Sequence, residues 1–114
     1  MLRDPLVLLD DMLLAIRKLR SYTMEMTKNE LSKDERTLDA VIRNLEVLGE
    51  AAKYLPKDFK DQYRDIEWRK IAGLRDILIH QYFGIDIHII WDILETKLPS
   101  LEKNLQRILE NLAD

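Results

Sequence analysis

Apolar side chains recur every three or four residues along most of the chain, and this spacing most strongly limits its possible folds. At about 3.6 residues per turn, such a repeat gathers apolar side chains on one face of an α-helix. With only three Gly and three Pro to form turns, the sequence predicts an all-α fold: an antiparallel, up-and-down bundle of four or five helices. The most regular repeats are Leu2, Leu6, Leu9, Leu13 and Ile16; Leu38, Val41, Ile42, Leu45, Leu48, Gly49, Ala52 and Leu55; and Leu98, Leu101, Leu105, Ile108 and Leu112.

Capping residues predict where the first two helices begin and end. Asp4-Pro5 provides an N-cap followed by proline at the first helical position, and this helix is expected to fade over residues 21–26. A turn is expected over residues 27–31. Ser32, with a glutamate three residues later, fits a capping box and predicts the start of the second helix. Pro56 is expected to end that helix.

The second half of the chain carries similar signals. A short helical turn is expected over residues 58–63, and a third long helix over residues 67–82, ended by Gly84. Asp86 is expected to cap the next helix. Pro99 is expected to kink that helix or to restart it.

Gly49 lies inside the second predicted helix, where glycine costs about 1 kcal/mol relative to alanine. Small residues at this point would allow another helix to approach closely. We therefore expect close helix packing, or a functional opening, at Gly49.

Length and charge bound the class of protein. At 114 residues the chain can enclose one core but not two, so a single domain over residues 1–114 is predicted. A net charge of −3 argues against coating nucleic acid through bulk positive charge, but not against a local phosphate pocket. Four basic residues are candidates for such a pocket, although a solvated, mixed-charge helix face is an equally good interpretation of the first three: Arg64, Arg69, Lys70 and Arg75.

The remaining composition favours a cytoplasmic protein without cofactors. The chain has no cysteine, and therefore no disulfide framework, and only two histidines. The two histidines are not spaced as metal ligands on one helix would be. No signal-peptide core or membrane-spanning apolar run is present.

Residues 77–94 are apolar nearly all round, whereas a surface helix of a monomer should present one polar face. The surplus predicts a second buried surface, and a twofold homodimer is the commonest way to bury one. The alternative is a central helix enclosed by its own bundle.

The octapeptide from Arg75 to Tyr82 concentrates the side chains suited to chemistry. Arg75 and His80 are five positions apart, so they point about 140° away from each other on one helix. Two such helices paired across a twofold axis would bring both side chain types into one cleft. Asp76, four positions before His80, could fix the imidazole tautomer and raise its pKa.

These groups suit cleavage of RNA, whose own 2′-hydroxyl can attack the neighbouring phosphate. His80 would act as general base or acid, and Arg75 would hold the phosphate oxygens and stabilise the charge of the transition state. The product would carry a 2′,3′-cyclic phosphate. From the residues alone, a histidine bonded to Asp76 and an ordinary surface arginine remain a strong alternative.

The pattern Arg75-x4-His80-x-Tyr82 resembles the signature of the HEPN superfamily, and specifically of the HepT-like toxins. An Arg-x4-His pair alone would be a weak signal, but its flanking segments make it specific. Segments that also look like this family are residues 43–53, 68–75, 83–86 and 98–101. One departure is Glu67, which occupies a position where the family often has proline.

The resemblance implies an all-helical HEPN homodimer that acts as a metal-independent endoribonuclease toxin. It also implies a cognate nucleotidyltransferase antitoxin as partner. By the resemblance, Arg75 and His80 would be the catalytic pair, supported by Asp76. From the residues themselves, Arg69 and Lys70 are the candidate phosphate or RNA contacts. Tyr82 matches the tyrosine that the antitoxin AMPylates, and a bulky anionic nucleotide there would block the phosphate site.

Two alternatives remain open. One is a non-catalytic subunit that binds a nucleotide or docks the nucleotidyltransferase, and the acidic charge favours it. The other is a purely structural bundle. The intact set of Arg75, His80 and Tyr82 favours the enzyme.

Overall fold

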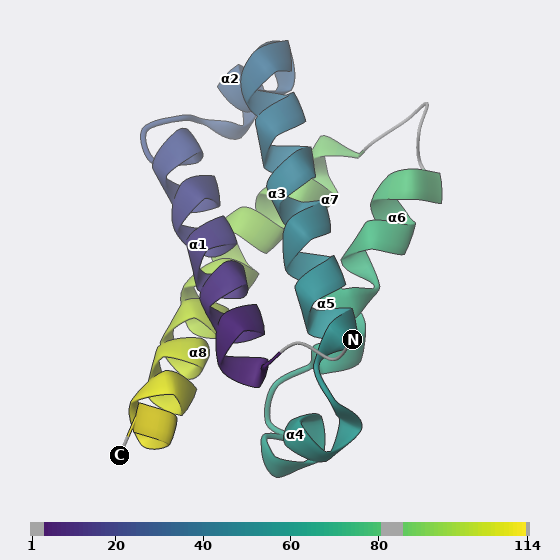
Figure 1. The fold of residues 1–114 in the computed structure, drawn as a ribbon. Helices are drawn as coiled ribbons and strands as arrows, with labels where there is room; N and C mark the ends of the chain where they lie inside the picture. Colours follow the sequence, from purple (N-terminus) through teal and green to yellow (C-terminus); the bar gives the residue numbers. More distant parts are fainter. Residues whose placement is uncertain (1–3, 81–85, 114) are drawn as a thin grey trace.

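The computed structural model describes residues 4–80 and 86–113, apart from the side chains of residues 79 and 80. All regular structure within these ranges is helical, which confirms the predicted all-α class. Four long helical segments alternate in direction along the bundle, with two short helices at its ends (Figure 1). In chain order the elements are α1 (Pro5–Thr23), α2 (Lys28–Lys33), α3 (Glu35–Tyr54), α4 (Lys57–Gln62), α5 (Trp68–Ala72), α6 (Leu74–His80), α7 (Ile87–Asp92), the π-helical turn η1 (Ile93–Lys97) and α8 (Leu98–Ala113).

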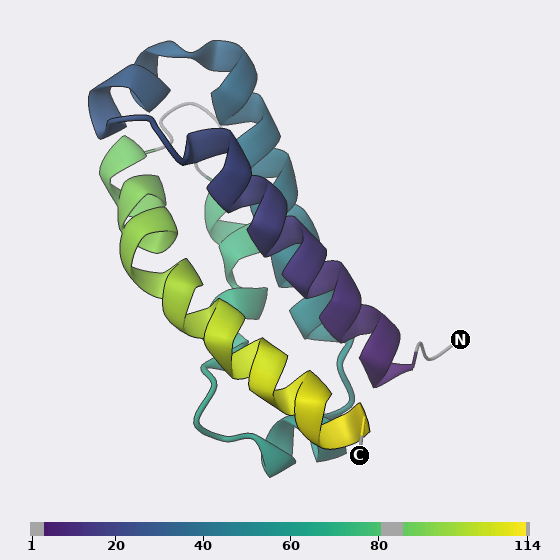
Figure 2. The same cartoon turned by 90° about the vertical axis from the view of Figure 1, so that its left-hand side faces the viewer.

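Helix α3 is at the centre of the packing. It contacts α1 on one side and α5 and α6 on the other, while α1 also packs against α8 (Figures 1 and 2). The predicted apolar faces supply the core, and each fully buried leucine contributes about 1.5–3 kcal/mol. Fully or nearly fully buried are Leu9, Leu13 and Ile16 of α1, Val41, Leu45, Leu48 and Ala52 of α3, and Leu98, Leu105 and Ile108 of α8.

Two predicted caps are confirmed. The Asp4 carboxylate accepts a hydrogen bond from the Leu6 backbone N–H at 2.9 Å, ahead of Pro5. The Asp86 carboxylate accepts one from the His88 N–H at 2.9 Å and begins α7.

The predicted start of the second helix at Ser32 is wrong. The capping box is formed by Thr27 and Glu30 and opens the short helix α2, in the stretch expected to be a turn. Ser32 lies inside α2, where its hydroxyl donates to the Asn29 carbonyl. Helix α3 begins three residues later, behind Asp34. Both Thr27 and Ser32 have a glutamate three residues on, so the motif alone could not choose between them.

The third long helix is interrupted, which the sequence prediction missed. It begins at Trp68, breaks at Gly73 and continues as α6 from Leu74. The Gly73 N–H still donates to the Arg69 carbonyl at 2.9 Å and the Ile77 N–H to the Gly73 carbonyl at 3.1 Å, so α-helical hydrogen bonds continue on both sides of the interruption. The predicted end of this helix, at residues 81–84, lies outside the described residues.

Pro99 falls in the first turn of α8, directly after a π-helical turn, so the helix is irregular next to this proline. Proline has no N–H to donate, and its ring would clash with the carbonyl four residues earlier in a regular helix. The chain widens just before it into η1, where the Leu98 N–H bonds to the Ile93 carbonyl. Helices α7 and α8 thus form one nearly continuous rod (Figure 2).

Ion pairs fasten α8 to the rest of the bundle. Arg20 of α1 pairs with Glu102, and Arg107 pairs with Asp65, whose oxygen lies 2.9 Å from its guanidinium. Exposed pairs of this kind contribute at most about 1 kcal/mol each. Among the described helices, none combines the length and the apolar character needed to cross a membrane.

Candidate functional site

The site region begins where α3 meets the junction of α5 and α6. A Cβ atom built on Gly49 would lie 3.0 Å from the Ile71 carbonyl oxygen and 3.3 Å from the Arg75 nitrogen. The backbones of the two segments therefore approach so closely that a side chain at Gly49 would require its neighbours to shift by a few tenths of an ångström. This confirms the expectation that another helix packs closely against Gly49.

Trp68 anchors the other end of this segment. Its indole N–H donates to the Tyr63 carbonyl at 3.0 Å, and its ring lies 6.3 Å from that of Phe59. Because Trp68 is buried and hydrogen-bonded, the start of α5 is held firmly against the core.

Arg75 is the second residue of α6 and is partly buried against α3. No hydrogen bond or ion pair joins its guanidinium to another residue of the described ranges. A guanidinium has five N–H donors and stays charged at any physiological pH. Arg75 thus combines a backbone fixed by tight packing with a cation that no described carboxylate neutralises.

The structure describes the other predicted catalytic residues only in part. Asp76 is exposed on α6, and residue 80 is the last of that helix, so positions 75 and 80 do share one helix. Five residues of helix separate their directions by about 140°, as the sequence suggested. The side chain of His80 and the whole of Tyr82 lie outside the described residues, so their roles stay predictions.

Two candidate phosphate contacts, Arg69 and Lys70, are exposed on α5. The Lys70 ammonium lies 2.6 Å from a Glu67 carboxylate oxygen. This hydrogen bond raises the pKa of Lys70 and lowers the pKa of Glu67, whose carboxylate is also close to Lys97. The pair neutralises much of the charge of Lys70, which leaves Arg69 as the stronger candidate. The three-residue spacing of Glu67 and Lys70 could have predicted this ion pair from the sequence.

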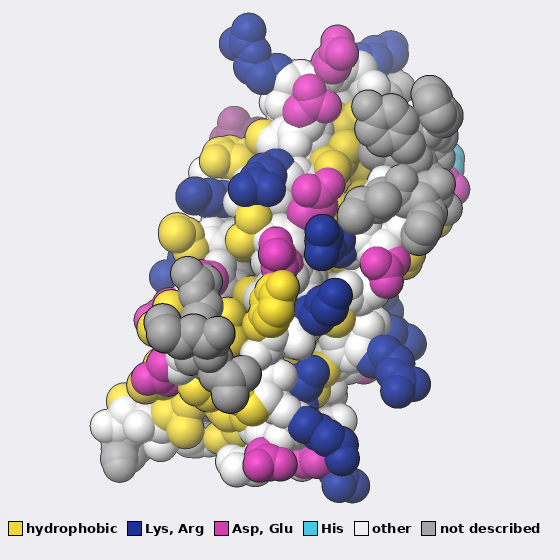
Figure 3. All heavy atoms as spheres, turned by 45° about the vertical axis from the view of Figure 1, so that its right-hand side comes forward, with side chains coloured by type: hydrophobic (Ala, Val, Ile, Leu, Met, Phe, Trp, Pro, Cys, Tyr) yellow, Lys and Arg dark blue, Asp and Glu magenta, His cyan; other side chains and the backbone are white. Residues whose placement is uncertain are grey.

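The surface on this side of the molecule mixes charge and exposed apolar side chains. Figure 3 shows Lys and Arg side chains, with Asp and Glu among them, over the lower part of this face. Ile77 of α6 and Ile89 of α7 are 42% and 40% exposed. Both belong to the apolar stretch that predicted a dimer, and the dimer itself stays a prediction.

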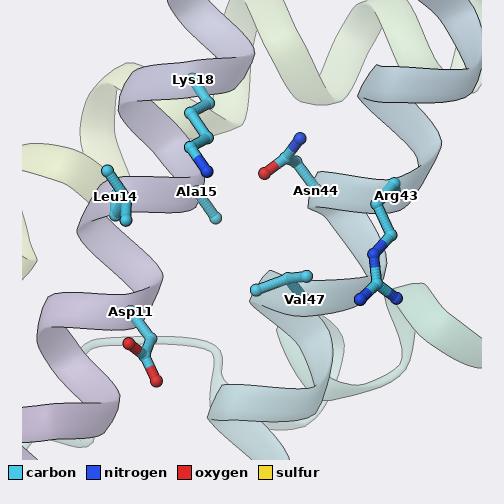
Figure 4. A pocket seen from close by; sticks show the side chains of 7 residues that line it. All are labelled: Asp11, Leu14, Ala15, Lys18, Arg43, Asn44 and Val47. Atoms are coloured by element: carbon cyan, nitrogen blue, oxygen red, sulfur yellow. The ribbon is translucent and has the colours of Figure 1, made fainter.

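A groove between α1 and α3 was not predicted. It lies on the opposite side of α3 from the α5–α6 junction and contains none of the predicted site residues (Figures 1 and 4). Its polar groups come from both helices, and the Asn44 amide is held by a 2.9 Å hydrogen bond to the Ala40 carbonyl. It is lined by Asp11, Leu14, Ala15 and Lys18 of α1 and by Arg43, Asn44 and Val47 of α3. In residues 4–78 and 86–113, no three side chains of His, Asp or Glu converge as metal ligands would.

The arrangement is a helical bundle with an arginine, Arg75, that has no charged partner among the described residues and lies on a helix packed closely against the centre. Comparison with known proteins gives the class. Residues 12–108 match the model of the Ribonuclease HepT-like family. The chain therefore belongs to this family of HEPN-type helical ribonucleases, and its enzyme class is ribonuclease.

Individual relatives agree with the family match. A Methanocaldococcus jannaschii protein named "Putative RNase" is 44% identical over 96% of this chain and 91% of its own length. A Thermococcus cleftensis protein named "Probable ribonuclease HepT" is 39% identical over 88% of this chain and 91% of its own. A further M. jannaschii protein is named "Gamma-glutamylcyclotransferase and putative RNase". It is 36% identical over 98% of this chain, which spans only 50% of that protein. No solved structure matches the chain significantly.

Proposed function

We propose that the chain is a metal-independent endoribonuclease whose active site is shared by two copies. In the proposed reaction, the 2′-hydroxyl of one nucleotide attacks the adjacent phosphorus, and the bond to the 5′-oxygen of the next nucleotide breaks. The products are a 2′,3′-cyclic phosphate and a 5′-hydroxyl end. His80 accepts the 2′ proton or donates one to the leaving 5′-oxygen, and Arg75 binds the non-bridging phosphate oxygens.

The observation that supports this proposal most is the packing and the charge of Arg75. Its backbone is seated against α3 beside Gly49, while no other described residue neutralises its guanidinium. A buried or half-buried cation without a partner is costly, so a protein usually retains one where an anionic ligand binds. A phosphodiester would supply the missing charge and accept paired hydrogen bonds from the guanidinium.

The shared site follows from the helix geometry. Because positions 75 and 80 diverge by about 140° on α6, one copy cannot easily direct both side chains at one phosphate. A twofold pairing that covers the exposed side chains of Ile77 and Ile89 would bring α6 of each copy to the same cleft. That cleft would then combine residues from both copies.

A cleavage assay with purified variants tests the proposal. Arg75→Ala should lower the rate on a single-stranded RNA by about 10²–10³-fold, the typical cost of removing one donor to a transition-state oxyanion. His80→Ala should lower it by about 10²–10⁴-fold. Arg36→Ala, an exposed arginine of α3, is the matched control and should keep full activity.

The chemistry of the ends makes the assay decisive. The upstream product should carry a cyclic phosphate that acid opens and phosphatase alone does not remove. If well-folded Arg75→Ala and His80→Ala proteins cut RNA as fast as the unchanged chain, or if the ends are 3′-hydroxyls, the assignment is wrong.

We further propose that the enzyme is the toxin of a toxin–antitoxin pair, controlled by a nucleotidyltransferase that AMPylates Tyr82. Tyr82 is two positions beyond His80 in the sequence, and we expect a nucleotide on its hydroxyl to bring negative charge and bulk to the proposed phosphate site. After co-expression with such an enzyme, intact mass should rise by one or more AMP units. Tyr82→Phe should abolish the increase, and an increase that persists would place the modification elsewhere.

A second candidate is a non-catalytic subunit that binds a nucleotide or docks the nucleotidyltransferase. The net charge of −3 favours it, because a nuclease acting on long RNA gains from a positive surface. This candidate predicts no RNA cleavage by the unchanged chain, together with a stable complex with the nucleotidyltransferase.

A further inference from the structure

The contact at Gly49 involves backbone atoms of the segment that carries Arg75. The missing Cβ would lie 3.0 Å from the Ile71 carbonyl oxygen, 3.3 Å from the Arg75 nitrogen and 3.5 Å from the Ala72 carbonyl oxygen. These three atoms come from the last turn of α5 and the first turn of α6. Gly49 therefore touches the junction at which the Arg75 helix begins.

A side chain at this position would require α3 and that junction to move apart by a few tenths of an ångström. Ordinary van der Waals contacts of a Cβ start at 3.4 Å, whereas the Ile71 carbonyl oxygen would lie at 3.0 Å, so an alanine at Gly49 would push the two apart by roughly 0.4 Å. The neighbours are backbone atoms, which cannot rotate aside as a flexible side chain could. Trp68 fixes the start of α5, so we expect part of the displacement to reach the end of the junction that carries Arg75.

We infer that Gly49 is a positioning residue for Arg75: the absence of its side chain sets the distance between α3 and α6 and so the place of the guanidinium. This inference rests on the proposed role of Arg75 in cleavage. Arg75 needs an exact position for the proposed reaction, because a guanidinium binds a phosphate through a rigid, directional fork and tolerates little displacement.

The size of the effect follows from the displacement. A misplacement of about 1 Å at a catalytic site can cost roughly 10²-fold in rate. A shift of roughly 0.4 Å then corresponds to a loss of about five- to tenfold. Since Arg75 is proposed to act most strongly on the transition state, kcat should fall while KM changes less than about twofold.

The test compares two glycine-to-alanine changes in the full chain. Gly49→Ala should lower kcat by about five- to tenfold on a defined RNA oligonucleotide. Gly73→Ala is the matched control, two residues before Arg75. Its Cβ would meet only the Arg69 and Lys70 carbonyls of its own preceding turn, at 3.3 and 3.5 Å. The control should stay within about twofold of the unchanged chain.

A second pair of variants separates positioning from a general loss of structure. Lysine binds phosphate as a point charge on a flexible stem, so it should tolerate a small shift of its helix. In the Arg75→Lys background, Gly49→Ala should therefore change kcat by less than about twofold. An equal loss in both backgrounds would show that Gly49 does not act through Arg75 and would overturn the inference.

The remaining outcomes are also decisive. If Gly49→Ala keeps full activity while Arg75→Ala loses it, the inference fails and the proposed function stands. If Arg75→Ala cuts RNA normally, both fail. Loss of cooperative unfolding in Gly49→Ala would show that the close contact serves the fold, and this too would overturn the inference.

Discussion

Ile77 and Ile89 present large apolar side chains at the surface, one in α6 and one in α7. In the proposed dimer, the partner covers both. Replacing Ile77 with alanine removes most of the apolar surface that this residue offers to the partner, without introducing a charge. More than half of the Ile77 surface is covered within the protomer, so urea denaturation should first show that Ile77→Ala remains folded.

The expected weakening can be worked out from the exposure. Burying an isoleucine completely contributes about 1.5–3 kcal/mol, and 42% of the Ile77 residue surface is available to a partner. Each copy then loses about 0.6–1.3 kcal/mol, and the twofold symmetry doubles this to about 1.3–2.5 kcal/mol. The dissociation constant should rise by up to roughly 10–70-fold. Ile89→Ala should give a similar result, because its exposure is 40%.

Sedimentation equilibrium over a dilution series would measure the change. Leu14→Ala is the control, since Leu14 is 53% exposed but lies on α1, away from α6 and α7. Specific cleavage activity should fall together with the dimer fraction. An unchanged dissociation constant in both isoleucine variants, or an equal weakening by Leu14→Ala, would refute the proposed interface.

Three further predictions concern the fold and the chemistry. Leu13→Ala should lower the unfolding free energy by about 2–5 kcal/mol, whereas Leu14→Ala should change it by less than about 0.5 kcal/mol; urea denaturation compares them. Hydrogen bonds from the Thr37 N–H and hydroxyl lower the pKa of Asp34 below its ordinary 3.8. The contribution of the Asp34 carboxylate to stability is therefore complete above pH 3.8 and is lost as the pH falls through the lowered pKa. Acid titration of Tm should show this loss, whereas Asp34→Asn, which keeps a capping oxygen but does not titrate, should not show it. Cleavage should continue undiminished in EDTA, and a need for divalent ions in the gel assay would contradict the proposed mechanism.

The architecture could be predicted because burial follows helical spacing. Leu45, Leu48 and Ala52 are buried where their spacing placed them, and the same holds for most of α1 and α8. Element boundaries were less predictable, because short motifs compete locally. Thr27 and Ser32 carry the same capping pattern, and the structure uses Thr27, which begins a short helix whose Leu31 is buried in the core.

The break at Gly73 could not be read from the sequence for a similar reason. One glycine costs a helix only about 1 kcal/mol, so its position alone does not predict an interruption. For the candidate site, spacing placed positions 75 and 80 on one helix, and the glycine at position 49 correctly indicated a close contact. Spacing could not identify which segment makes that contact. Nor can the spacing within one chain determine how a second copy would complete the cleft.

The aromatic anchor at the start of α5 has a practical use. Trp68 is one of only two tryptophans, and it precedes Arg75 by seven positions on the segment that carries the proposed phosphate site. In a Trp91→Phe protein, all indole emission would come from this one ring. Binding of an RNA strand near Arg75 could then be followed by intrinsic fluorescence in solution, with no dye attached.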